Sequence, residues 1–460
     1  MKRLENRGAR FGATLLVLWL GVGVVGCNSL LDVENPNRVV AEDVLVPSAA
    51  QAVANGALYE VQAGYTYMLM VYGTASDELE WCGSRDAFEE LDFGWIDRPL
   101  NEFSDESFKD MAPARWMADE AIEILEGHIA NGESGIEGPL AEAYLWAAFN
   151  RVVIADVWED FTFSDKRVAA PPIGEANMGG LYTTAIDYLT SGLALNPSTD
   201  MERYLTAMRA RARHAQGVWN LIGNTYNPSN GLIGASAASA AAADAAAALA
   251  LDNSDWEYIF TYTSTTTYND IAGNVNSRLE MRFGDRYILA EDGGTGKRRD
   301  LTAADRGIVL ADPISGNADM RLDDFMTPFE DGITNGDLPV LSAAEMYLIL
   351  AEDAIVRGDD AAFATNINAP RAWAGLPAWT AASGVSQIDM LIYERQVELY
   401  LQMRRLNDMY RFGIESDNWQ ATSHAVTSPG TFFPITKAEI DANCYINPDW
   451  PADVPCGDGG

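Results

Sequence analysis

Histidine and cysteine, side chains that often bind metals or act as nucleophiles, are scarce in this sequence. The 460 residues include four cysteines and three histidines, His128, His214 and His424. The histidines are far apart and in no ligand spacing, so no metal centre is expected from them. We interpret all three as surface or structural residues.

Motifs that define common catalytic sites are also missing. The sequence contains no G-x-S-x-G, no H-E-x-x-H and no G-x-x-x-x-G-K-[ST]. The many carboxylates would allow a glycosidase pair, but no pattern singles out two of them, so a surface hydrolase is an unsupported reading. We predict a protein without catalytic residues, metal ion or cofactor.

Basic residues are few compared with acidic ones. Lys and Arg total 31 against 67 Asp and Glu, which gives a formal net charge of −36. Such a balance argues against nucleic acid as a partner and against electrostatic docking on anionic lipid.

Long apolar runs are absent except near the N-terminus, where the sequence resembles a lipoprotein signal. Lys2 and Arg3 open a basic region, Phe11–Val25 is apolar but short for a bilayer span, and Val24-Val25-Gly26-Cys27 matches a lipobox. We predict a signal peptide over residues 1–26, a lipidated tether over 27–40, and attachment to a lipid bilayer through acylated Cys27. The G-x-G-x-x-G formed by Gly21, Gly23 and Gly26 lies inside this signal and is no dinucleotide site.

The remaining chain, residues 41–460, has the composition of a folded, helical protein. Hydrophobic residues make up 48% and aromatic residues 10%, enough for a large core. Helix pairs joined by short breaks predict a mainly α, tetratricopeptide-like repeat scaffold. The expected helices are 47–72, 104–130 with Ser104 or Asp105 as cap, 139–157, 178–195, 201–221 and 343–357. For the last, we expect Ser342 as cap, Glu345 completing a capping box and Gly358 as the stop.

Ile392–Gly413 is expected to be a single helix of about six turns, because it has no Gly or Pro before its end. It carries apolar residues on more than one side together with many charges. These charges must be paired if they are buried, and Arg404 with Asp408 is an expected i,i+4 pair.

Residues 224–341 differ from the rest and predict a loop-rich insertion. Ala235–Leu251 is a helical alanine run, followed by a Thr- and Tyr-rich stretch and by repeated Asp, Gly and Pro. Near the C-terminus, Cys444 and Cys456 are a plausible disulfide, although other pairings that use Cys82 stay open.

Several segments, in order along the chain, resemble the SusD/RagB family. They are L-D-V-E-N-P-N from Leu31, A-A-E-M-Y-L-I-L-A-E from Ala343, E-R-x-x-E-L from Glu394 with R-R, Asp408 and R-F-G, and F-P-I, E-I and N-P up to Pro448. The resemblance implies a lipoprotein of the outer membrane, exposed at the cell surface. It also implies a protein that binds a neutral oligosaccharide or another nutrient and delivers it to a TonB-dependent, SusC-like transporter.

Ligand-binding residues are expected where aromatic and polar residues meet in loops. Asp77, Trp81 and Arg85 follow the first long helix, a region that in the SusD family contributes to the ligand face, and Trp373 and Trp379 flank a Gly and a Pro before the 392–413 segment. Trp81 and Trp373 can equally be core residues, and for Trp379 core packing is the favoured interpretation. The alternative function is a lipid-anchored helical scaffold that binds peptides or proteins.

Overall fold

The computed structural model describes residues 44–165, 168–223, 231–263, 265–288, 307–331, 335–451, 453–454 and 456. The predicted signal peptide, Cys27 and the tether lie outside the described residues. The chain divides between Ala49 and Ala50. The short helix η1 (Pro47–Ala49) ends the first part, and the part that begins at Ala50 is described by itself below.

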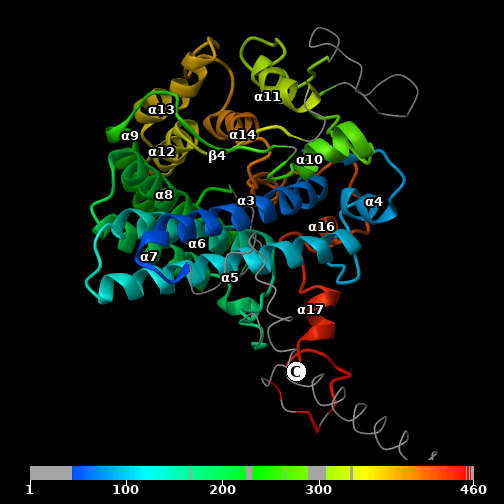
Figure 1. Cartoon of the computed structure of the whole chain (residues 1–460). Coiled ribbons are helices and arrows are strands. Elements are labelled where there is room, and N and C mark those ends of the chain that lie inside the picture. The colour runs from blue at the N-terminus through cyan, green and yellow to red at the C-terminus, as the bar shows by residue number, and fades with distance from the viewer. Residues whose placement is uncertain are drawn as a thin grey trace, which may run out of the picture. The chain divides into compact units, whose positions relative to one another are not determined.

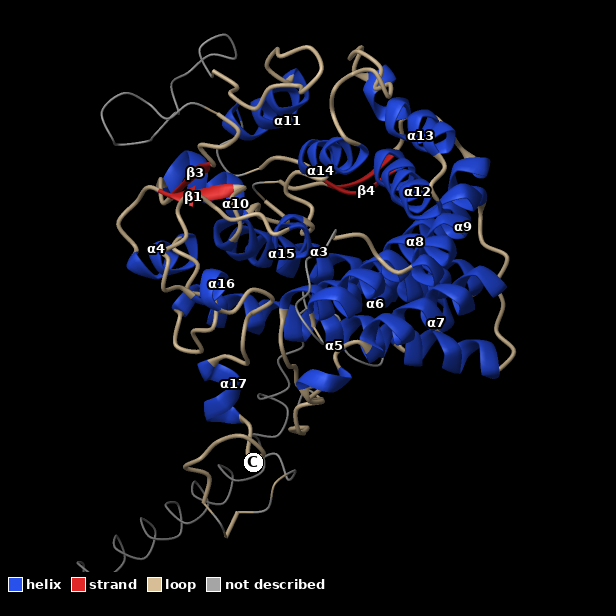
Figure 2. Ribbon diagram, turned by 180° about the vertical axis from the view of Figure 1, so that it is seen from behind, coloured by secondary structure: helices blue, strands red, loops and turns tan. Residues whose placement is uncertain are grey.

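Long helices form the body of this part, and in chain order each packs against the next (Figures 1 and 2). They are α3 (Ala50–Ala75), α5 (Glu102–Ala130), α6 (Glu137–Val157), α7 (Gly180–Ala194), α8 (Thr199–Ile222), α9 (Ala235–Leu251), α12 (Ala343–Arg357) and α13 (Asp360–Trp373). The predicted mainly α, tetratricopeptide-like scaffold is confirmed.

Shorter helices and strands complete this part of the chain. The helices are α4 (Asp86–Asp92), η2 (Glu175–Asn177), α10 (Asp270–Gly273), η3 (Asn274–Arg278), α11 (Met320–Asp331), α14 (Gln387–Glu398), α15 (Arg405–Phe412), α16 (His424–Thr427) and α17 (Lys437–Ala442). The strands are β1 (Leu79–Trp81), β2 (Glu257–Phe260), β3 (Met281–Phe283) and β4 (Leu338–Ser342). They form two antiparallel ribbons, β1 with β3 and β2 with β4.

The core centres on α6, whose residues are buried on all sides from Leu140 onward. A helix that is apolar all round needs neighbours on every face, and α3, α5, α7 and α8 supply them. Trp146 and Phe149 of α6 pack against Phe260 of β2 with ring centroids 5.5 and 5.7 Å apart. The β2–β4 ribbon is thereby fixed to the helical array.

Helix boundaries follow the sequence closely where local signals are strong. α9 spans Ala235–Leu251 as expected, Ser342 caps α12, and Gly358 ends it with φ 70°. The capping-box prediction is wrong in one respect, because the Glu345 carboxylate binds the Arg211 guanidinium at 2.6 Å. The cap of α5 is also different: Asn101 accepts from the backbone N–H groups of the first turn.

The prediction of one helix over Ile392–Gly413 is wrong. α14 ends at Glu398 and α15 begins at Arg405, with a turn between them in which Leu401 and Met403 adopt left-handed φ values of 52° and 55°. Such a conformation costs about 1–2 kcal/mol for each non-glycine residue. Buried contacts offset that cost. The backbone N–H of Leu401 donates to the Glu78 carboxylate at 2.8 Å, and the Tyr400 hydroxyl donates to the Glu78 carbonyl oxygen at 2.7 Å.

The charges of this segment are buried and paired, as expected, but mostly with distant elements. Arg404 binds Asp156 of α6, so the predicted Arg404–Asp408 side-chain pair is wrong. Asp408 instead lies 2.8 Å from both Arg395 and Arg411. The segment therefore connects helices that are far apart in the sequence.

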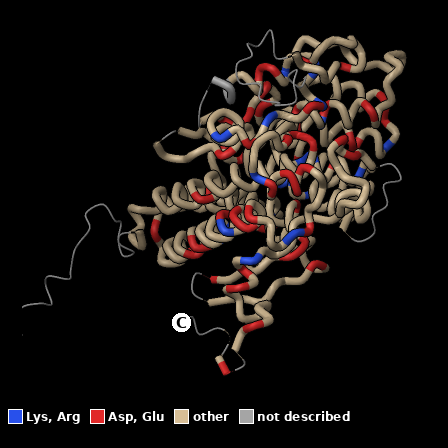
Figure 3. The backbone as a smooth tube through the Cα atoms, turned by 90° about the vertical axis from the view of Figure 1, so that its right-hand side faces the viewer, with Lys and Arg blue, Asp and Glu red and all other residues tan. Residues whose placement is uncertain are grey.

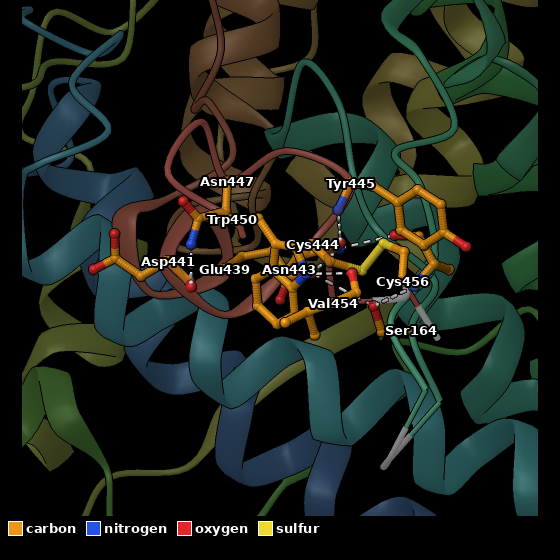
Figure 4. The surroundings of a disulfide bond; sticks show 11 residues. Ser164, Glu439, Asp441, Asn443, Cys444, Tyr445, Asn447, Trp450, Val454 and Cys456 are labelled. Carbon is orange, nitrogen blue, oxygen red and sulfur yellow. Dashed lines mark hydrogen bonds between the residues drawn. A yellow bond between two sulfur atoms is a disulfide. The ribbon is translucent and has the colours of Figure 1, made fainter. Parts of the chain in front are cut away.

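The C-terminal segment extends away from the helical array beyond α17 (Figures 1 and 2). The predicted disulfide between Cys444 and Cys456 is confirmed, with Cα atoms 5.5 Å apart (Figure 4). Two hydrogen bonds hold the base of the segment on the body. The Thr162 hydroxyl donates to the Glu439 carboxylate, and the Asn443 side-chain amide donates to the Ala170 carbonyl oxygen. The Sγ atom of Cys82 lies 3.8 Å from the carbonyl oxygen of Leu279.

Acidic residues are spread along the whole described tube, and basic residues are fewer (Figure 3). Within the described ranges, no helix combines the length and the apolar character that a membrane crossing demands.

We predict that replacing both Cys444 and Cys456 by serine loosens the C-terminal segment while leaving the body folded. The disulfide closes a short loop, worth about 3 kcal/mol of chain entropy, whereas Glu439 and Asn443 hold α17 independently. Limited proteolysis should cut within residues 444–456 faster in the double variant, with an unchanged thermal midpoint of the body. A midpoint lowered by many degrees would contradict this division.

Candidate functional site

A cavity of about 540 Å³ lies where the β2–β4 ribbon meets α11, α13 and α14. Figures 1 and 2 show β4, α11, α13 and α14 in the upper part of the view. Its walls combine charged, aliphatic and aromatic side chains. They are Asp255, Glu257, Ile259, Arg321, Asp324, Phe325, Asp337, Pro339, Pro370, Trp373, Ala374, Val397, Glu398, Tyr400 and Gln402.

Alternation along β2 supplies one wall of the cavity. Tyr258 and Phe260 contact Trp146 in the core, whereas Glu257 and Ile259 are exposed and line the cavity. Side chains two residues apart on a strand lie on the same face. The strand thus places one carboxylate and one aliphatic group, 44% exposed at Ile259, next to each other.

A buried network of ion pairs among Arg321, Arg371, Glu394 and Glu398, called the frame below, holds the wall opposite β2. Arg321 of α11 binds Glu394 of α14 at 2.7 Å and Glu398 at 2.5 Å. Arg371 of α13 binds the same Glu394 at 2.6 Å. One carboxylate therefore joins three helices, and both Arg371 and Glu394 are fully buried. Arg guanidinium groups suit such sharing because their donors lie in a rigid fork.

The frame positions Trp373 at the rim. Arg371 also donates to the Pro377 carbonyl oxygen at 2.9 Å, which fixes the chain just after α13. Gly375, with φ 67°, makes the turn there. Trp373 packs edge-on against Tyr347 at 5.5 Å and keeps 37% of its surface exposed.

Glu398 is the titratable group inside the cavity. Burial raises its pKa to about 7, and the neighbouring charge of Glu394 adds to this, although Arg321 acts in the opposite direction. Burial also raises the pKa of Asp255 and of Glu257, and the two carboxylates repel each other. The cavity is a strongly acidic environment.

Of the five residues predicted to bind ligand, Trp373 lines this cavity. Trp379 lies behind it, 4% exposed, where its indole N–H donates to the Val385 carbonyl oxygen at 2.9 Å and its ring packs against Phe363.

Asp77, Trp81 and Arg85 lie elsewhere. Asp77 is 4% exposed and receives two hydrogen bonds of 2.7 Å from Arg405. Trp81 is half-buried in β1, and Arg85 stands before α4 with its guanidinium 5.6 Å from the centre of the Phe103 ring. The structure therefore does not bring the five residues together.

Sequence reasoning missed most of the cavity walls. The alternating Glu257-Tyr258-Ile259-Phe260 pattern could have identified the exposed face of β2. No local signal connects Arg321 with Glu394, since their contact spans 73 positions of the chain.

A second, smaller cavity of about 320 Å³ lies between α3, α5 and the loop before α10, with Tyr59 and Tyr268 exposed beside it. Among the residues that the structure describes, no three His, Cys, Asp or Glu side chains are grouped so that they could hold a metal ion.

The architecture defines a class: a helical-repeat protein whose shorter elements frame a ligand-sized cavity. Solved structures share this fold. A SusD homolog from Bacteroides thetaiotaomicron VPI-5482 has a TM-score of 0.60, 14% identity and coverage of 87% of this chain and 96% of its own. A SusD superfamily protein from Parabacteroides distasonis ATCC 8503 has a TM-score of 0.59 and 11% identity, with coverage of 88% of this chain and 98% of its own. One from Bacteroides vulgatus ATCC 8482 has a TM-score of 0.56 and 14% identity, with coverage of 86% of this chain and 97% of its own.

Residues 321–448 match the SusD family, and this stretch contains α12–α17, nearly all of α11 and cavity residues such as Arg321, Trp373 and Glu398. Over these residues the chain is similar to the SusD family, and the solved structures above share its fold at 11–14% identity. No curated protein matches the chain.

We predict that Asp77→Asn destabilises the fold by about 3 kcal/mol, because it leaves the buried Arg405 without its full counter-charge. Burial alone would raise the pKa of Asp77, but Arg405, Arg286 and Tyr287 lower it overall. A carboxyl with a lowered pKa stabilises the fold above its unfolded pKa of about 3.9 and loses this contribution as the pH falls further. Urea unfolding should therefore show a large difference from wild type at neutral pH that shrinks below about pH 4.

The exposed Asp417 offers a matched control. Asp417→Asn should leave the urea midpoint within experimental error of wild type. If Asp77→Asn behaves like this control, the structural assignment of Asp77 is wrong.

Proposed function

We propose that this protein captures an oligosaccharide in the cavity between the β2–β4 ribbon and α11, α13 and α14. The observation that carries the proposal is the partly exposed Trp373 at the rim of a cavity that otherwise offers carboxylates. Ligand sites commonly combine an apolar wall with a few placed polar groups. The apolar C–H face of a sugar ring can stack on the indole, while its hydroxyl groups donate to Glu257, Asp324 or Glu398.

The comparison with solved structures supports this choice of ligand. One structure with the same fold, described as being with xylogluco-oligosaccharide, has a TM-score of 0.51 and 13% identity, covering 79% of this chain and 82% of its own. The match of residues 321–448 to the SusD family points the same way.

The proposed setting is the outer surface of the outer membrane, with the chain anchored through acylated Cys27. The bound oligosaccharide then passes to a TonB-dependent, SusC-like transporter. The lipobox supports lipid attachment, and the family resemblance supports the transporter. In this role the protein binds its ligand and breaks no bond.

We expect purified protein to bind at least one oligosaccharide of a panel saturably in calorimetry, without new reducing ends in the same samples. Trp373→Ala should weaken that binding about tenfold, because covering roughly 55 Å² of indole at about 25 cal/mol per Å² is worth about 1.4 kcal/mol. The exposed Tyr445 on the C-terminal segment, 48% exposed, gives the control Tyr445→Ala, which should bind as wild type does.

Three results would overturn the proposal. New reducing ends would indicate a hydrolase. Equal binding by Trp373→Ala and wild type would move the site away from this cavity. Saturable binding of peptides with silence across all oligosaccharides would favour the helical peptide-binding scaffold instead.

A further inference from the structure

The charges around the cavity are strongly one-sided. Asp255, Glu257, Asp324 and Asp337 are exposed on its walls. Arg321 is the one basic residue among the described residues that line the cavity. A ligand that enters meets an excess of negative charge focused by a concave wall.

Arg321 does not offset this excess for a ligand, because its guanidinium is already used. It contacts Asp319 at 2.5 Å, Glu394 at 2.7 Å and Glu398 at 2.5 Å. Its side chain is 16% exposed. A carboxylate or sulfate on a ligand would therefore find no open cation on these walls.

Unlike Arg321, the carboxylates at the rim of the cavity have no ion-pair partner among the described residues. In the described part of the chain, no Lys or Arg lies within ion-pair distance of Asp255, Glu257 or Asp324, which project from the β2 side and from α11. Their charges are thus directed at the cavity and at solvent.

The inner wall adds an acceptor without a donor. Gln402 is 2% exposed and lines the cavity; its side-chain N–H donates to the Glu398 carbonyl oxygen at 2.9 Å. Its Oε1 atom is buried and has no hydrogen-bond partner within the described ranges. A buried acceptor of this kind costs free energy unless a donor reaches it. A ligand that complements these walls therefore carries hydrogen-bond donors, preferably positively charged ones.

A divalent cation does not fit this arrangement. The acids come from four different elements, and among the described residues no three of them converge as metal ligands would. Carboxylates spread beside an aromatic face suit a ligand whose positive charges are distributed along a chain of rings with apolar faces.

We propose that the preferred ligand is an amine-bearing oligosaccharide of the glucosamine type, with one ring on Trp373 and its ammonium groups toward Glu257 and Asp324. This inference rests on the proposed function and narrows it to one substrate class. Uronic-acid and sulfated oligosaccharides are excluded by the same charges.

The test compares two ligands of equal length and linkage, a β-1,4-glucosamine oligomer and its N-acetylated counterpart, by calorimetry at mildly acidic pH and low salt. We expect the amine form to bind at least about tenfold more tightly, because its ammonium groups form ion pairs with the rim carboxylates that the N-acetylated form cannot form. The difference should shrink in high salt because exposed charges are screened.

Variants assign the effect to the cavity. Glu257→Gln combined with Asp324→Asn should remove most of the preference for the amine form, while the N-acetylated form still binds because the amide oxygens of Gln and Asn keep accepting from its hydroxyl groups. The control is Glu123→Gln, an exposed acid on α5 away from the cavity, which should keep the full preference.

Each other outcome counts against the inference in a distinguishable way. Equal affinity for both forms would overturn the charge preference and leave the capture of oligosaccharides standing. Silence with every oligosaccharide would overturn the proposed function as well. An oligolysine that binds as tightly as the amine sugar, and does so equally in Trp373→Ala, would assign the cavity to peptides.

Discussion

Buried arginine–carboxylate pairing is the constraint on which this structure depends. Arg405 with Asp77, Arg404 with Asp156 and Arg411 with Glu352 each join the chain around α15 to a different helix or strand region. Removing one partner of such a pair leaves a charge that the interior cannot solvate. The pairs therefore fix one mutual arrangement of the helices, which apolar packing alone would specify less strictly. The left-handed turn after α14 is held separately, by the contacts of Tyr400 and Leu401 with Glu78.

The same type of interaction organises the cavity. Glu394 is shared by Arg321 and Arg371, so α11, α13 and α14 are held at one buried carboxylate. Trp373 sits two residues beyond Arg371, and Glu398 lies one helical turn beyond Glu394. The positions of the stacking face and of the inner acid are consequently set by the frame, and a ligand meets walls that need little rearrangement. The positive charge of Arg321 is also neutralised by its ion pairs, so the exposed carboxylates dominate the charge of the cavity.

Local signals in the sequence were sufficient for much of the fold. α9 and α12 begin and end where alanine content, Ser342 and Gly358 predict, because caps and propensity act over a few residues. They failed at Ile392–Gly413, where helix propensity is overridden by contacts from Glu78, more than 300 positions earlier. For the site, Trp373 could be predicted because it is an aromatic residue beside a Gly turn. Asp77 resembled a loop acid but is a core partner of Arg405. Alternation along β2 marks Glu257 as exposed, but only the folded chain places it with Asp324 around one cavity.

The division between frame and rim has a consequence for how such a protein can diversify. Glu257, Asp324 and Trp373 project outward from elements whose places are fixed by other residues, and the Glu257 and Asp324 carboxylates take part in none of the ion pairs of the frame. Exposed substitutions of this kind usually change stability by less than about 0.5 kcal/mol. Ligand preference can therefore drift by single surface changes while the folded body stays the same. A change of ligand would then require no substitution in the core.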